Sequence, residues 1–259
     1  MKVRKIITII LIILIFLSTG RIYTFAMDTG FKTDNMESEE QQTFLKNVDL
    51  NLITEQPPSY SVLCFDVNED GLIALGSKAL DKKIVSIYSS DGVFMYGYTF
   101  NCSGSYGIEW DENNLIIYFV RSDVAAMFDE KGSCLELKMI PITAENNSYW
   151  NYFVFSKKRI VGESEYRLKN DMGPFLNVFA SSYSQLIKTD SDGSTTVIYD
   201  VSDSQLLYSI IWIAAIVLII AIAITAIAKQ WKKNIKESNK NDELINSIMK
   251  NAFDNNNQK

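Results

Sequence analysis

The sequence of 259 residues contains no histidine and only three cysteines. Without histidine the chain lacks the usual general base, any Ser-His-Asp triad and every imidazole ligand for a metal. The cysteines, Cys64, Cys102 and Cys134, have no zinc-binding spacing, and their odd number leaves at least one without a partner in the chain. We therefore expect a protein that is not an enzyme.

The first of two long apolar runs covers residues 6–17 and follows three basic residues. As a helix it would span about 18 Å, which is less than the ~30 Å hydrocarbon core of a bilayer. A polar break follows, and Thr24 and Ala26 are small residues at the positions that signal peptidase reads. This pattern predicts a signal peptide over residues 1–26, with an uncleaved N-terminal anchor as the alternative.

The second apolar run, Leu206–Ala228, contains no charged residue. As a helix it would be about 34 Å long, enough to cross a bilayer with some tilt. Tyr208, Trp212 and Trp231 flank it as interfacial aromatic residues do, and four lysines follow at once. The run predicts a transmembrane helix over 206–228 and, by the positive-inside rule, a cytoplasmic tail over 229–259.

The charges agree with this single-pass topology in a cell membrane, with the N-terminal domain outside. Residues 27–205 carry 14 basic and 27 acidic side chains, whereas residues 206–259 carry seven basic and four acidic ones. An acidic outer segment repels nucleic acid, so we expect no nucleic-acid partner. The Asn-, Ile- and Lys-rich usage points to an AT-rich, bacterial source.

The outer segment divides into a polar stretch and a series of short strands. Residues 27–60 are polar and predict a tether, with one strand near 44–53. Beyond residue 61, β-branched and aromatic runs alternate with turns, which predicts three units of two hairpins at a period of about 40–45 residues. The third unit carries an insertion within 162–182. The predicted first hairpins cover 65–75, 108–118 and 153–161, and the second ones cover 84–98, 124–139 and 185–199.

A four-stranded antiparallel unit that recurs at this period resembles a β-propeller blade of the NHL type or of six-bladed bacterial propellers, over residues 61–200. The resemblance implies strands buried on both faces, which fits the nearly apolar runs 115–120 and 150–155. Closed propellers have four to eight blades. Three units are too few for a closed propeller, so three arrangements stay open. Residues 44–53 and 162–182 could form a fourth blade, two three-unit chains could form a homodimer, or the units could form a β-sandwich.

The predicted fold class is thus an all-β domain over residues 61–202, propeller-like or a sandwich of repeated four-strand units, plus one transmembrane α-helix.

One segment matches half of a calcium-binding loop. Asp66, Asn68 and Asp70 offer oxygen ligands at alternate positions before Gly71, so Ca²⁺ is the one cofactor to consider. The twelfth position is Ser77, where such loops carry glutamate. The alternative is an ordinary hairpin turn at Asp70-Gly71.

Aromatic residues supply a second candidate. Tyr149, Trp150 and Tyr152, with Tyr106 and Trp110, suit a surface on which a sugar or peptide stacks. Their strand context favours the alternative of core packing.

Paired carboxylates are the third candidate. The pairs Glu109/Asp111 and Glu163/Glu165 are of the kind that glycosidases use, which defines a surface hydrolase as one alternative function. Acidic residues beside strands are more often solvated.

The tail carries apolar residues at helical spacing: Leu244, Ile245, Ile248, Met249 and Phe253. Asn241 fits the N-cap of a short helix over this stretch. About 12 residues are too few for a stable isolated helix, so this face needs a protein partner or the membrane surface. The alternative is a disordered tail.

The first functional hypothesis is a membrane-anchored module that binds a protein or ligand outside the cell as an accessory subunit of a membrane assembly. The second is a transmembrane sensor that signals through its tail, and the third is the hydrolase. The predicted partners are the lipid bilayer and a protein.

Overall fold

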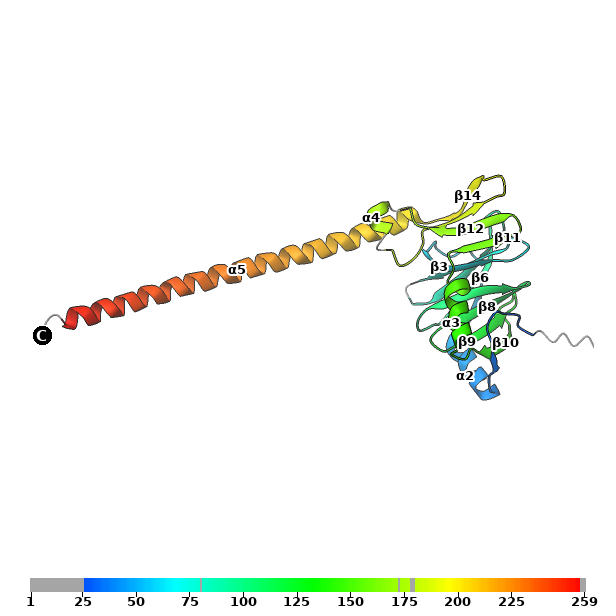
Figure 1. The fold of residues 1–259 in the computed structure, drawn as a ribbon, viewed down its shortest axis with the longest axis horizontal. Coiled ribbons are helices and arrows are strands. Elements are labelled where there is room, and N and C mark those ends of the chain that lie inside the picture. Colours follow the sequence, from blue (N-terminus) through cyan, green and yellow to red (C-terminus); the bar gives the residue numbers. More distant parts are fainter. Residues whose placement is uncertain (1–25, 80, 172, 178–179, 257–259) are drawn as a thin grey trace, which may run out of the picture. The chain divides into compact units, whose positions relative to one another are not determined.

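The computed structural model describes residues 26–79, 81–171, 173–177 and 180–256 (Figure 1). The chain divides into a β-rich unit that ends at Ser202 and a helical unit that begins at Asp203. The signal peptide predicted for residues 1–26 falls almost wholly outside the described residues.

The β-rich unit contains three antiparallel sheets, each built on four consecutive strands. The first sheet consists of β3 (Val62–Val67), β4 (Ile73–Lys78), β5 (Lys83–Tyr88) and β6 (Phe94–Phe100), with β2 (Asn51–Ile53) at its edge. The second consists of β7 (Tyr106–Asp111), β8 (Asn114–Phe119), β9 (Val124–Phe128) and β10 (Cys134–Met139), with β1 (Asp34–Asn35) at its edge. The third consists of β11 (Lys158–Val161), β12 (Ser164–Lys169), β13 (Gln185–Thr189) and β14 (Thr195–Asp200).

Five of the six predicted hairpins are confirmed, because β3–β4, β5–β6, β7–β8, β9–β10 and β13–β14 all pair in antiparallel register. Four of these hairpins turn at a glycine, Gly71, Gly92, Gly132 or Gly193, with φ between 78° and 82°. Glycine is the residue that adopts this left-handed conformation without steric cost. The turn residues therefore set the strand boundaries of all three sheets.

The sixth predicted hairpin, over residues 153–161, is wrong. The chain instead forms helix α3 (Ala144–Tyr149), which continues as one π-helical turn, η1 (Trp150–Val154), and the third sheet begins only at β11. Thr143 caps α3 by accepting a hydrogen bond from the backbone N–H of Asn146. Trp150 and Val154, four residues apart, pack inward while Tyr152 is 84% exposed, which is helical rather than alternating burial.

The predicted tether over residues 27–60 is also wrong, because this segment is built into the sheets. β1 pairs with β10, and β2 pairs with β6. Between them, helix α2 (Ser38–Val48) buries one apolar face that includes Phe44 and Val48. The polar composition of the segment concealed these few apolar residues, and the strand expected over 44–53 is limited to Asn51–Ile53.

The first sheet lies between the other two and is buried on both faces. One core joins it to the second sheet and contains Ala74, Ile108 and Ile117. Another core joins it to the third sheet and contains Ile73 and Leu75. Neighbouring residues of β4 thus face different cores, as side chains alternate along a strand. The doubly buried strand expected over 115–120 is confirmed as β8, whereas the one expected over 150–155 is wrong, because Trp150–Val154 forms the π-helical turn η1.

The outer face of the second sheet is covered by a third cluster, in which Phe31, Val154 and Trp150 pack on Ile116 and Tyr118. The helices α3 and η1 and the N-terminal segment therefore close this side of the stack (Figure 1). In the described part of the chain none of the three sheets closes on itself. The all-β fold is confirmed at this level, whereas the propeller resemblance stays a prediction.

Helix α5 (Ser202–Asn256) contains the predicted membrane segment. Its most apolar window has a mean hydropathy of 3.1 with no residue buried, and it is the one helix in the described residues that is long and apolar enough to cross a membrane. The separate tail helix capped by Asn241 is wrong, because Asn241 lies inside α5. No glycine or proline interrupts residues 229–256, so nothing there ends the helix.

Candidate functional site

A pocket of about 1110 Å³ opens where the first strands of the three sheets meet. β3 lies against both β7 and β11, and all three strands contribute to the lining. The π-helical turn η1 and residues 28–30 complete the wall. The hairpin order of each unit brings its first strand to this place, so residues far apart in the sequence share one cavity.

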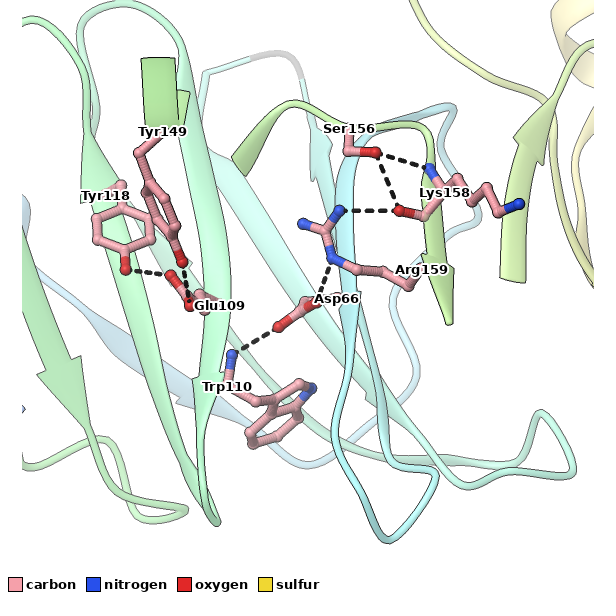
Figure 2. A network of polar contacts seen from close by, with 8 residues as sticks. All are labelled: Asp66, Glu109, Trp110, Tyr118, Tyr149, Ser156, Lys158 and Arg159. Carbon is pink, nitrogen blue, oxygen red and sulfur yellow. Dashed lines mark hydrogen bonds and ion pairs between the residues drawn. The ribbon is translucent and has the colours of Figure 1, made fainter. Parts of the chain in front are cut away.

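Asp66 lines this pocket and joins the three sheets (Figure 2). Its Oδ1 accepts a hydrogen bond from Nε of Arg159 on β11 at 2.6 Å, and its Oδ2 accepts one from the backbone N–H of Trp110 on β7 at 2.8 Å. The Asp66 and Arg159 side chains are each only 7% exposed. Burial raises the pKa of Asp66, and the nearby Arg159 guanidinium opposes this shift.

The Arg159 guanidinium is held on several sides. Its Nη1 donates to the Lys158 carbonyl at 3.1 Å, and the rings of Phe153 and Phe65 lie 4.6 Å and 5.5 Å from its central carbon. Its Nη2 is buried and has no hydrogen-bond partner in the described residues. The Arg159 side chain is therefore fixed in place while one of its donors stays unused.

Trp110 carries a second unused donor. The residue is 9% exposed and lines the pocket, and its indole Nε1 finds no acceptor among the residues that the structure describes. Buried polar groups in native proteins nearly always have a partner, so these two shielded and unpaired donors are unusual.

Glu109 is the second buried carboxylate of the site (Figure 2). The Tyr149 hydroxyl donates to its Oε1 at 2.6 Å, and the Tyr118 hydroxyl donates to its Oε2. Burial raises the pKa of Glu109, and the two tyrosine hydrogen bonds oppose this shift. We call the four buried residues Asp66, Glu109, Trp110 and Arg159 the pocket floor.

The pocket lining is strongly acidic. It contains two basic side chains, Lys158 and Arg159, against seven carboxylates, Asp28, Asp66, Glu69, Asp70, Glu109, Asp111 and Glu112. Burial raises the pKa of Asp111, the backbone N–H of Asp28 opposes this shift, and the charges of Asp28 and Glu112 reinforce it. The Lys158 ammonium forms an ion pair with Glu165, outside the lining, at 2.6 Å.

The calcium-loop residues line the pocket, where Asn68 serves the hairpin and Asp66 joins the sheets. Asn68 accepts a hydrogen bond from the backbone N–H of Leu72 through its side-chain oxygen at 2.8 Å, and Asp66 is engaged as described. The alternative interpretation, a hairpin turn, is confirmed by the β3–β4 pairing. No cluster of three His, Cys, Asp or Glu side chains with metal-binding geometry is found in the described ranges.

The predicted aromatic surface is divided among different surroundings. Tyr149 binds Glu109, Trp150 packs against Phe31 at 4.8 Å between ring centres, and Tyr152 projects at the pocket rim. Tyr106 is buried, with its hydroxyl donating to main-chain carbonyls of the first sheet. Of the three residues proposed for stacking, Tyr152 lines the pocket.

Arg159 was missed as a site residue, and its strand context gave no usable signal, because Arg167 in β12 has the same context and is exposed. Glu109 was considered only as one of a carboxylate pair with Asp111. The three cysteines form no disulfide within the described chain, and none lines this pocket.

The tail residues Leu244, Ile245, Ile248 and Met249 are more than half exposed on α5, while the side chain of Phe253 lies outside what the structure describes.

Comparisons of the chain with protein families, with curated proteins and with solved structures find no match.

Proposed function

We propose that this protein is a single-pass, membrane-anchored binding module whose pocket holds a ligand or part of a protein partner outside the cell. In this proposal it acts as an accessory subunit of a larger membrane assembly. The observation that carries it is the pocket of about 1110 Å³, which is lined by the first strands of all three sheets and holds seven carboxylates against two basic side chains. The apolar stretch of α5 supports the anchor.

Recognition rather than catalysis fits the floor of the pocket. The Asp66 and Glu109 carboxylates are both engaged by fixed donors of the protein itself. Such carboxylates hold neighbouring strands in position, and a rigid floor lowers the entropic cost of binding. We therefore assign these two carboxylates a structural role.

Site-specific photocrosslinking tests this function in the cells that make the protein. A photoreactive amino acid at Tyr152, 84% exposed on the pocket rim, should give a discrete adduct. The same group at Ile142, 81% exposed and outside the lining, is the matched control and should give none. Identical patterns at both positions, or no adduct at either, would contradict the proposal.

A second candidate, a transmembrane sensor, is favoured by the continuity of α5 from Ser202 to Asn256. One uninterrupted helix joins the apolar stretch to the exposed residues Leu244, Ile245, Ile248 and Met249. Deleting residues 241–253 should leave ligand binding unchanged and abolish the cellular response. An unchanged response would exclude this candidate.

The propeller-like arrangement is also retained as a proposal, either within one chain or completed by a second copy. Light scattering of the detergent-solubilised full chain separates the two cases, because a homodimer doubles the protein mass.

A further inference from the structure

We propose that cleavage of the signal peptide after Ala26 creates a new contact, in which the Glu136 carboxylate binds the freed α-ammonium group of Met27 and fixes the new N-terminus to the second sheet. This inference goes beyond the proposed function and is independent of the ligand that the pocket holds.

The cleavage position is that of the predicted signal peptide. Hydrolysis of the peptide bond between Ala26 and Met27 by a signal peptidase consumes one water molecule. It leaves a carboxylate on Ala26 and a free α-amino group on Met27, which is largely protonated at neutral pH. Ala26 is exposed, whereas Met27 is half-buried, so cleavage at this bond leaves the half-buried segment intact.

The Met27 nitrogen lies at a carboxylate. It donates to Oε2 of Glu136 on β10 at 2.5 Å, and the Glu136 side chain is only 20% exposed. Before cleavage this donor is a neutral amide with one N–H, whereas after cleavage it is an ammonium group with a positive charge and three N–H donors. A hydrogen bond between charged groups is roughly twice as strong as a neutral one. Cleavage therefore turns an existing neutral contact into an ion pair.

The charges around this contact favour a cation. The backbone N–H of Asp28 donates to Oδ2 of Asp111 at 2.9 Å. Burial raises the pKa of Asp111, and the charges of Asp28 and Glu136 add to the increase. Among the described residues, the one ion pair of these three carboxylates joins Glu136 Oε1 to Lys138 at 2.9 Å. The α-ammonium group of Met27 adds a second positive charge at the other oxygen, Oε2.

The segment that follows Met27 is seated on the same sheet. Met27 packs against the third cluster, and the Phe31 ring lies 4.9 Å from that of Tyr118 between centres. Inward and exposed side chains alternate along residues 27–31, as in an extended segment. Residues 28–30 line the pocket. Binding of the α-ammonium group therefore holds this wall of the pocket at its N-terminal end.

The first measurement identifies the N-terminus of the full chain, purified from membranes of the cells that make it. N-terminal sequencing and the intact mass should both place the N-terminus at Met27. A chain that still begins at Met1, as an uncleaved anchor would, or one cut at any other bond would overturn the proposal.

Cross-linking with a carbodiimide tests the contact in the same sample. This reagent joins a carboxylate to an amine that touches it, forming an amide while the carbodiimide becomes a urea. Peptide mapping should find the α-nitrogen of Met27 linked to Glu136. A link between Lys138 and Glu136 is the internal control, because these groups lie 2.9 Å apart in any case. Absence of the Met27 link would contradict the proposal.

Variants separate the charge of Glu136 from its burial. Glu136→Gln keeps an oxygen that accepts from Met27 but loses the charge. With N-hydroxysuccinimide acetate at neutral pH, the α-amine of the wild type should be acetylated about fivefold to tenfold more slowly than that of Glu136→Gln, as one charge-assisted hydrogen bond predicts. Lys138→Gln removes the other partner of Glu136, and Glu130→Gln removes an exposed carboxylate in the β9–β10 turn. Both should leave the α-amine as slow as in the wild type.

Equal rates in the wild type and Glu136→Gln, or fast acetylation in Lys138→Gln, would overturn the assignment of Glu136. The N-terminus and the cross-link are measured on the wild type, so the test does not depend on the folding of a variant.

Discussion

Replacing Asp66 with asparagine tests how the three sheets are held together around the pocket. The asparagine oxygen can still accept from the backbone N–H of Trp110, but the amide cannot neutralise Arg159, which stays buried. Breaking a buried ion pair by removing one partner costs about 3–5 kcal/mol. In a domain of this size the loss corresponds to a fall in melting temperature of about 6–20 °C.

The assay is thermal unfolding of the full chain in detergent, followed by the near-ultraviolet circular dichroism of the buried tyrosines. Glu165→Gln is the matched control, because Glu165 contacts Lys158 and Arg167 at the same 2.6 Å but in exposed surroundings. Screening by water makes such pairs weak, so the control should change the melting temperature far less.

A double variant separates the charge effect from packing. Adding Arg159→Met to Asp66→Asn removes the buried charge as well, so the double variant should be more stable than Asp66→Asn alone. The reasoning is refuted if Asp66→Asn melts within the range of the Glu165→Gln control, or if the double variant is the less stable of the two.

Three further predictions concern titration, thiol reactivity and topology. Burial raises the pKa of Glu109, so the stability that its protonated form contributes is complete below the unfolded pKa and is lost as pH rises through the folded pKa. The melting temperature of Glu109→Gln should therefore rise relative to that of the wild type between pH 4 and pH 8. A difference in melting temperature that stays constant over this range would contradict the prediction. Burial raises the pKa of Cys64 to about 12, so iodoacetamide at pH 8 should label Cys102 before Cys64 in mass-spectrometric mapping, and equal labelling would count against the buried position. Protease added to intact cells should digest the β-rich unit and leave a fragment that carries residues 229–256, whereas loss of that fragment would place the tail outside.

Local chemistry made much of the fold predictable. A glycine at a turn and β-branched residues on both sides of it act over a few residues, so hairpins such as β3–β4 and β13–β14 could be located from sequence. The errors occurred where burial depended on a distant surface. Trp150 and Val154 lie in helical turns because both pack on the outer face of the second sheet. Phe44 and Val48 pack against the core and so hold an otherwise polar segment on it.

The site was less predictable than the fold. Asp66 was identified, but for calcium, because its partner Arg159 lies 93 residues away in the sequence. Glu109 and Tyr149 are separated by 40 residues, and no spacing rule connects them. Arg159 carried no distinguishing local signal either, because Arg167 also lies within a short strand and its side chain is exposed.

The sequence by itself determined the properties that depend on neighbouring residues: the repeated hairpins, the uncharged run within α5 and the acidic charge of the β-rich segment. Only the tertiary structure decided which side chains meet. Asp66, Trp110 and Arg159 come from three different sheets, and the pocket exists because their first strands pack side by side. The same packing removes water from Arg159 and Trp110, which leaves donors unpaired that would be satisfied in an unfolded chain.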